Sequence, residues 1–226
     1  FYEYCELLHI AVPELPKDID PMQLYLRDER EQQDILRKLS ALQVHFIRYL
    51  QVGGFPELAL SKDDLYAQRV LREDIVDKAL KRDIPAIYGI RSIADIERIF
   101  LYLCYNSSNI INLQTMGKEM DGVSRTTIEK YIGYLESASL IYVSPLVTLD
   151  AKKVLKNQNK IYIADAAMRN AVLMKDDITN DPEELGLIAE TAVYKHIKAF
   201  YYADAPTVGY YRGGKGKEID IVVKSE

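Results

Sequence analysis

The chain has 226 residues, of which 48% are hydrophobic and 28% are charged, so it can bury a core and divide into two or three small domains. Its formal net charge of -5 is not that of a protein that coats polyanions, which restricts any nucleic-acid contact to a local basic patch. Two cysteines are too few for a disulfide framework, and no signal peptide or apolar run of roughly 18 residues predicts a membrane segment. We therefore expect a cytoplasmic protein without a membrane partner.

The first third of the chain is expected to be helical. Apolar residues recur at helical spacing over residues 35–50, and the glycine pair at 53–54 ends this helix. A second amphipathic helix over residues 63–84 is expected to stop at Pro85. We assign residues 1–86 to one helical unit.

The middle of the chain has the element order of a winged helix-turn-helix. A turn at Asp121-Gly122 separates the second and third of its helices. The order helix, helix, turn, helix, strand, loop, strand predicts this fold for residues 87–165. The spacing places the three helices and two strands at residues 92–106, 113–120, 124–136, 140–147 and 160–165.

The third of these helices is expected to be a recognition helix, with Ser124 as its N-cap and Thr126 with Glu129 as a capping box. Its apolar residues form one packing face, so the polar residues between them lie on the opposite face. Arg125 is expected to bind guanine, and the threonines and Lys130 are expected to bind phosphate. The lysines of the next loop are expected to form the wing. The candidate DNA-binding residues are Ser124, Arg125, Thr126, Thr127, Lys130, Lys152, Lys153 and Lys156.

An alternative role for this unit is protein-protein or interdomain contact. Winged helices also serve as rigid interaction modules, and Glu129 on the presented face is repelled by phosphate. The excess of basic over acidic residues around the unit is slight.

The sequence of the last third predicts a helix over residues 185–202, followed by a β-hairpin. The hairpin turn includes "GYYRGGKGK", which has the glycine and lysine spacing of a phosphate-binding loop. Gly216 stands where such a loop needs a Ser or Thr for magnesium, and a strand follows instead of a helix. We therefore interpret the glycines as a hairpin turn.

Two acidic residues in this part lie within apolar stretches, Glu190 on the helix and Asp220 in the final strand. A carboxylate in such a strand is costly without a partner such as a metal ion. The order of helix acid, hairpin and strand acid resembles the magnesium site of PD-(D/E)XK nucleases, which makes both residues candidate catalytic residues and metal ligands. That family also needs an E-x-K on the next strand, which is missing here, and Lys224 lies on the same strand as Asp220. The alternative is a pair of structural acids bound to Arg212 or Lys217.

Segments spread over nearly the whole chain resemble a widespread family of prokaryotic AAA+ ATPases that have a C-terminal domain of unknown function. The resemblance implies lid-like helices at 1–86, the winged helix at 87–165 and a truncated restriction-endonuclease-like α/β domain at 166–226. It makes Arg72 and Arg82 candidate nucleotide-sensing residues. The segments that carry it are "FYEYCELL", "VGGFPELAL", "VLREDIVDKALKRDI", "SRTTIEKYIGYLESASLIYV", "NKIYIADAAMRNAVL", "GLIAETAVYKHI" and "YYRGGKGKEIDIVV".

The expected fold class is mainly α with a smaller α+β part. The chain begins at Phe1 and stops within a predicted strand, so we expect a fragment without a cofactor and without activity of its own. ATP and magnesium are expected for the parent ATPase, with DNA and the ATPase core as partners and a homo-oligomer left open. The leading hypothesis is the DNA-binding part of an ATPase. The alternatives are a magnesium-dependent nuclease that lacks its last motif and a protein-protein interaction module.

Overall fold

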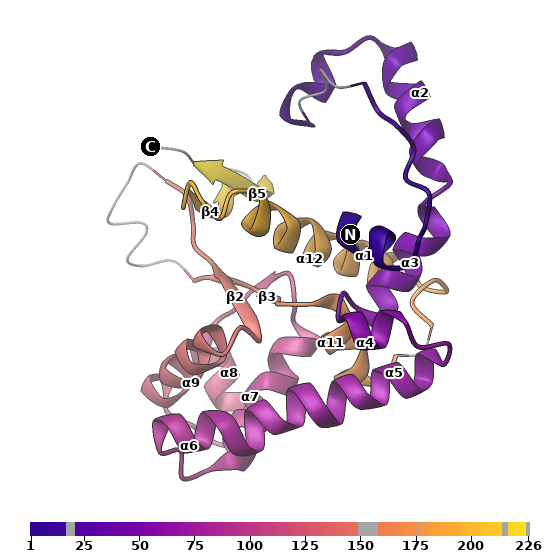
Figure 1. Cartoon of the computed structure of the whole chain (residues 1–226). Coiled ribbons are helices and arrows are strands. Elements are labelled where there is room, and N and C mark those ends of the chain that lie inside the picture. The colour runs from indigo at the N-terminus through magenta and orange to yellow at the C-terminus, as the bar shows by residue number, and fades with distance from the viewer. Residues whose placement is uncertain (17–20, 149–157, 176, 214–216, 225–226) are drawn as a thin grey trace.

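The computed structural model describes all residues except 17–20, 149–157, 176, 214–216 and 225–226 (Figure 1). The described chain is mainly helical with small antiparallel sheets, which confirms the expected mainly α class with a smaller α+β part. The first half contains α1 (Tyr2–Leu7), η1 (Pro21–Leu26), α2 (Glu29–Ser40), α3 (Gln43–Val52), α4 (Pro56–Ala59), α5 (Asp64–Val70), η2 (Leu71–Asp77), η3 (Ala79–Asp83) and α6 (Ile84–Tyr88). The second half contains α7 (Ile93–Tyr105), β1 (Asn109–Ile110), α8 (Leu113–Glu119), α9 (Arg125–Ser137), β2 (Ile141–Ser144), β3 (Lys160–Ile163), α11 (Ala166–Leu173), α12 (Pro182–Phe200), β4 (Thr207–Arg212) and β5 (Glu218–Lys224).

The first predicted helix is two helices in the structure. α2 begins at the N-cap Asp28, whose carboxylate accepts the Glu31 backbone N–H at 2.8 Å, and α3 starts after a turn at residues 41–42. The turn redirects the chain so that buried Leu42 joins the core formed with α1 and α12. Gly53 ends α3 with φ 84°, as the glycine pair predicts.

The second predicted helix does not stop at Pro85. α5, η2, η3 and α6 form one continuous helix that runs past Pro85 to Tyr88, and Gly89 ends it with φ 64° (Figure 1). The helix tolerates the proline because the wider π-helical winding of η3 ends just before it. Pro85 therefore lies in the first turn of a new α-helical segment, where no backbone N–H is needed.

The largest apolar core joins this long helix to the middle of the chain. Leu71 and Val76 from η2 pack in one cluster with Ile99 from α7, Ile128 from α9 and Ala171 from α11. The cluster therefore runs through all three ranges that the sequence suggested as units.

The strands of the middle part form a three-stranded antiparallel sheet of order β1–β3–β2. Ile141 pairs with Ile163 and Ser144 with Lys160. β1 has only two residues, so no period-2 pattern revealed it in the sequence. α8 and α9 lie between β1 and β2 in the chain, connected by a turn in which Asp121 and Gly122 have φ 52° and 86°.

The C-terminal part consists of α12 and the antiparallel hairpin β4–β5. The segment after β2 continues beside β4, because Val147 N–H donates to Tyr210 O at 2.7 Å and Tyr210 N–H donates to Pro145 O at 3.0 Å. The rings of Tyr162 and Tyr194 stack with centroids 4.1 Å apart and form a small core with Val208. Through these contacts the hairpin and α12 are joined to β2 and β3. Among the described residues, no helix is long and apolar enough to cross a membrane.

Candidate functional sites

The start of α9 is fixed by a side-chain cap. Ser124 Oγ accepts the Thr127 backbone N–H at 3.1 Å and lies 2.8 Å from the Thr127 hydroxyl. The expected capping box of Thr126 and Glu129 does not form, because Ser124 caps the helix and the Glu129 carboxylate instead accepts from Arg125 Nε at 2.8 Å. An arginine four residues away is a stronger partner for a carboxylate than a neutral backbone N–H.

We expect Ser124→Ala to lower the free energy of unfolding by about 1 kcal/mol, because the N–H of Thr127 loses its acceptor. Urea denaturation of the whole chain measures the change. Ser137→Ala is the matched control, since the hydroxyl of this exposed serine at the end of α9 donates to the Gly133 carbonyl and caps no helix start. Equal losses in the two variants would contradict a capping role.

The two flanks of α9 differ as the sequence predicts. Ile128 and Leu135 are completely buried, whereas Arg125, Thr126 and Lys130 are exposed. Thr127 is half-buried, and its hydroxyl lies beside the capping hydroxyl of Ser124. The polar flank of this helix is therefore accessible to a partner.

A hollow of about 560 Å³ runs along one side of α9. Arg125, Glu129 and Glu136 line it from the helix, and the opposite wall comes from β2, β3 and the residues before α8. The remaining lining residues are Ile111, Asn112, Leu113, Gln114, Ile132, Gly133, Val143, Gln158, Asn159 and Ile161. The walls are mixed in charge and not strongly basic.

The basic side chains near α9 are partly neutralised. Arg98 binds Asp121 at 2.9 Å, and Arg125 binds Glu129. Lys118 and Lys130 have no acidic partner within 4.0 Å among the described residues. The wing candidates Lys152, Lys153 and Lys156 lie outside the described residues.

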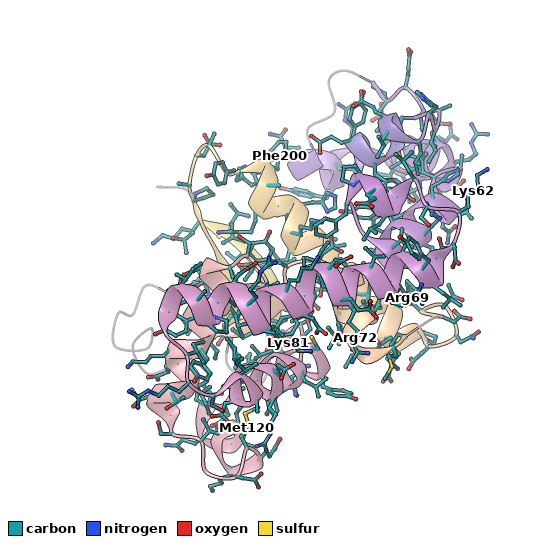
Figure 2. All side chains as sticks on the ribbon, turned by 60° about the horizontal axis from the view of Figure 1, so that its bottom comes forward. Lys62, Arg69, Arg72, Lys81, Met120 and Phe200 are labelled. Carbon is teal, nitrogen blue, oxygen red and sulfur yellow. The ribbon has the colours of Figure 1, made fainter. Side chains whose placement is uncertain are left out.

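The two candidate nucleotide-sensing arginines do not share a pocket. Arg82 is exposed and binds the adjacent Asp83, with Nε 2.6 Å from the carboxylate. Arg72 lines a shallow hollow of about 520 Å³ with Arg69 and Met174. Figure 2 shows Arg69 and Arg72 close together on the long helix. Nothing in the described structure brings the two guanidinium groups to one ligand.

The two candidate catalytic acids lie close together, and both contact the same lysine. Lys160 Nζ lies 2.9 Å from Glu190 Oε1 and 2.6 Å from Asp220 Oδ1. A third acid, Glu218, lies 3.3 Å from the same nitrogen. Lys160 and Tyr162 are two residues apart on β3 and so point the same way, and the Tyr162 hydroxyl donates to Glu190 at 2.7 Å. We call Lys160, Glu190, Glu218 and Asp220 the acid cluster.

The acid cluster keeps its lysine charged. Burial lowers the pKa of Lys160, but hydrogen bonds to Asp220 and Glu190 and their negative charges outweigh burial, so the pKa lies above its usual value. The pKa of Tyr162 is also raised, first by burial and then by its hydrogen bond to Glu190. At neutral pH Lys160 is therefore an ammonium group, and the neighbouring Tyr162 is a neutral phenol.

The magnesium ion implied by the nuclease resemblance does not fit this arrangement. Mg²⁺ binds carboxylate oxygens at about 2.0–2.1 Å, so an ion shared by Glu190 and Asp220 would overlap the lysine nitrogen that already lies between them. Among the described residues, no group of three or more His, Cys, Asp or Glu side chains has an arrangement that could hold a metal ion. The roles of Glu190 and Asp220 in catalysis or metal binding remain predictions.

The sequence interpretation did not include Lys160, Glu218 or Tyr162 in this site. It named Arg212 and Lys217 as partners for structural acids, but the cation that the acids contact is Lys160. A signal was present, because "KIYI" places a charged residue at the start of an apolar strand, as Glu218 is placed in "EIDIVV". The pairing itself joins residues 60 positions apart and has no local pattern.

Two further buried ion pairs hold α11. Arg169, which is 3% exposed, forms a bidentate pair with Glu184 on α12, and its Nε donates to the Cys104 carbonyl at 2.8 Å. Lys195 Nζ contacts Asp165 at 2.5 Å and the Tyr49 hydroxyl at 3.1 Å. The charge of Asp165 and the hydrogen bonds to Asp165 and Tyr49 outweigh burial and raise the pKa of Lys195, so Lys195 stays charged at neutral pH. Both pairs connect α12 to α11, and the Tyr49 contact also connects it to α3.

Comparison with known proteins places the chain in a family. Residues 43–179 match the domain of unknown function DUF8612, which covers more than half of the chain. The chain belongs to this family. The matched range extends from α3 to the segment after α11 and so includes the long helix, α9 and the three-stranded sheet.

Two curated relatives are uncharacterised proteins. One from Haemophilus influenzae is 26% identical over 134 residues, which is 58% of this chain and 33% of the relative. One from Methanocaldococcus jannaschii is 24% identical over 182 residues, which is 79% of this chain and 39% of the relative. The chain thus spans between a third and two fifths of their length. No solved structure gives a significant match.

Proposed function

We propose that α7 to β3 is a winged helix-turn-helix that binds duplex DNA through the polar flank of α9. The sheet order β1–β3–β2 and the helices α8 and α9 that precede β2 support this assignment. The observation that carries it is the contrast along α9, with Ile128 and Leu135 buried and Arg125, Thr126 and Lys130 exposed. These exposed residues lie in the first two turns, which a recognition helix presents to base edges.

Arg125 is available for this role despite its contact with Glu129. The pair is exposed, with 64% of the arginine side chain accessible, and such an i,i+4 pair contributes only about 0.3–0.5 kcal/mol. A bidentate contact of arginine with guanine is worth about 1–3 kcal/mol of discrimination. The contact with Glu129 is therefore weak enough for the guanidinium to leave it for a base edge, while Glu129 itself opposes nearby phosphates.

The chain is further proposed to be part of a longer AAA+ ATPase. The curated relatives are two to three times as long as the stretch that this chain spans, which leaves room for a nucleotide-binding core. In this proposal ATP and magnesium belong to that core, which is also the partner of the helices α1 to α6. Arg72 is then the better candidate of the two arginines for sensing a nucleotide, because Arg82 is paired with its neighbour.

Binding of a fluorescent duplex to the whole chain, measured by anisotropy at several salt concentrations, tests DNA binding. We expect the affinity to fall as salt rises, because phosphate contacts release counterions. The double substitution Arg125→Ala with Lys130→Ala should weaken binding about 10-fold or more and lower the salt slope by about one.

A charge-matched control separates site-specific loss from a general loss of positive charge. Arg37→Ala with Lys38→Ala removes one arginine and one lysine from α2, which lies at the opposite end of the molecule from α9 (Figure 1). This control should bind DNA as the unchanged chain does. Equal affinity of the α9 variant and the unchanged chain would refute the proposal, and no salt-dependent binding at all would favour the protein-protein alternative.

A further inference from the structure

The acid cluster differs from a metal site in where its positive charge lies. Lys160 is 2% exposed, whereas the side chains of Glu190, Glu218 and Asp220 are 26%, 29% and 55% exposed. The ammonium group is thus the innermost member, covered by the carboxylates it binds. A soluble ion could not exchange at this position without displacing the lysine.

The lysine also has the contacts that a structural cation needs. A buried ammonium group is unstable unless it is paired and hydrogen-bonded. Here Nζ has one carboxylate from α12 and two from β5, all within 3.3 Å, and Tyr162 adds a hydrogen bond to Glu190. One nitrogen of β3 thereby fixes both α12 and the hairpin.

From this geometry we infer that Lys160 is a built-in cation that excludes divalent metal ions from the acid cluster and fastens α12 and the hairpin β4–β5 to β3. The inference concerns a site separate from the DNA-binding flank of α9. It gives Glu190 and Asp220 a structural function in place of the metal-ligand function that their pattern predicts.

A second contact of the hairpin strengthens this connection. The Tyr210 hydroxyl of β4 donates to the Gln158 carbonyl at 2.7 Å, two residues before Lys160. Tyr162 also donates to the Asp220 backbone carbonyl at 3.3 Å. The hairpin therefore contacts Gln158, Lys160 and Tyr162 at and just before the start of β3. Among the described residues, the ammonium group of Lys160 is the one charged group of β3 that binds the hairpin.

Manganese binding to the whole chain tests the inference, with Mn²⁺ as the probe for a magnesium-type site. Calorimetry of the unchanged chain should show no saturable binding at millimolar Mn²⁺, and Mn²⁺ should not raise its melting temperature. Saturable binding that is lost in Glu190→Gln or Asp220→Asn would overturn the inference.

Lys160→Met removes the ammonium group and keeps most of the side-chain volume. This variant should melt at a lower temperature than the unchanged chain, and Mn²⁺ should restore part of the loss, because three carboxylates then lack a cation. Adding Asp220→Asn should abolish the restoration. A folded Lys160→Met variant that does not respond to Mn²⁺ would also overturn the inference.

Lys224→Met is the matched control, because Lys224 is an exposed lysine on β5 outside the cluster. It should neither lower the melting temperature nor create a response to Mn²⁺. If Lys160→Met does not fold, Mn²⁺ binding to the unchanged chain, compared with Glu190→Gln and Asp220→Asn, still tests whether the cluster excludes metal ions. Hydrogen exchange tests the structural role, because the amides of β5 should exchange faster in Asp220→Asn.

Discussion

Arg169→Met is expected to lower the free energy of unfolding by about 3–5 kcal/mol, the usual cost of removing one partner of a buried ion pair. Arg169 connects three helices at once. Its side chain lies in α11, binds the carboxylate of Glu184 in the first turn of α12, and donates to the carbonyl of Cys104 in the last turn of α7. Without the guanidinium group, Glu184 keeps a negative charge at a position that is only 15% exposed.

Urea denaturation of the unchanged chain and three variants measures this effect. Arg37→Met is the control, because its pair with Asp34 is exposed and should contribute little to stability. Arg169→Met with Glu184→Gln should recover part of the loss, since a neutral amide needs no counter-charge. A loss in Arg169→Met no larger than in Arg37→Met would show that the pair contributes little to stability.

Gly209→Ala is expected to lower the free energy of unfolding by about 3 kcal/mol, the upper end of the usual cost of overpacking. A Cβ atom at this position would lie 2.2 Å from the backbone oxygen of Pro145 and 2.8 Å from Val147 Cγ2. The obstacle is backbone that cannot rotate away. The substitution must therefore separate β4 from the segment after β2, which breaks the hydrogen bonds of Tyr210 with Pro145 and Val147.

Gly186→Ala is the matched control for this prediction. Gly186 lies inside α12, and an added Cβ there meets nothing within 4 Å. This change should raise the free energy of unfolding by about 0.8–1.0 kcal/mol, because alanine favours the helix over glycine. Opposite signs in the two variants are expected in denaturant titrations, and a neutral Gly209→Ala would mean that β4 does not pack as closely on Pro145.

The parts of the fold that the sequence predicted are those decided by residues close together in the chain. The Ser124 cap, the turn at residues 121–122 and the hairpin β4–β5 each depend on a few neighbouring residues. Their physical basis is local hydrogen bonding and backbone preference. The predicted end of the long helix at Pro85 was wrong, because a change to π-helical winding over η3 allows the helix to continue.

The candidate sites also contain features that the local sequence predicted and contacts that it did not. Periodicity alone separated the buried flank of α9 from its exposed flank, because a helix repeats every 3.6 residues. It also drew attention to Glu190 and Asp220 as acids in apolar surroundings. It could not supply their partner, since Lys160 lies 60 positions from Asp220 and on a different element from both acids.

By itself, then, the sequence determined the helices α7, α8, α9 and α12, the strands β2 to β5, the two flanks of α9 and the presence of acids that require a partner. Only the tertiary structure decided that this partner is Lys160, that Arg169 joins α7, α11 and α12, and that Gly209 lies against Pro145. The reason is that charge pairing and close packing depend on distance in space. Folding brings together residues that are far apart in the chain, and the sequence around each of them does not show which residue it will contact.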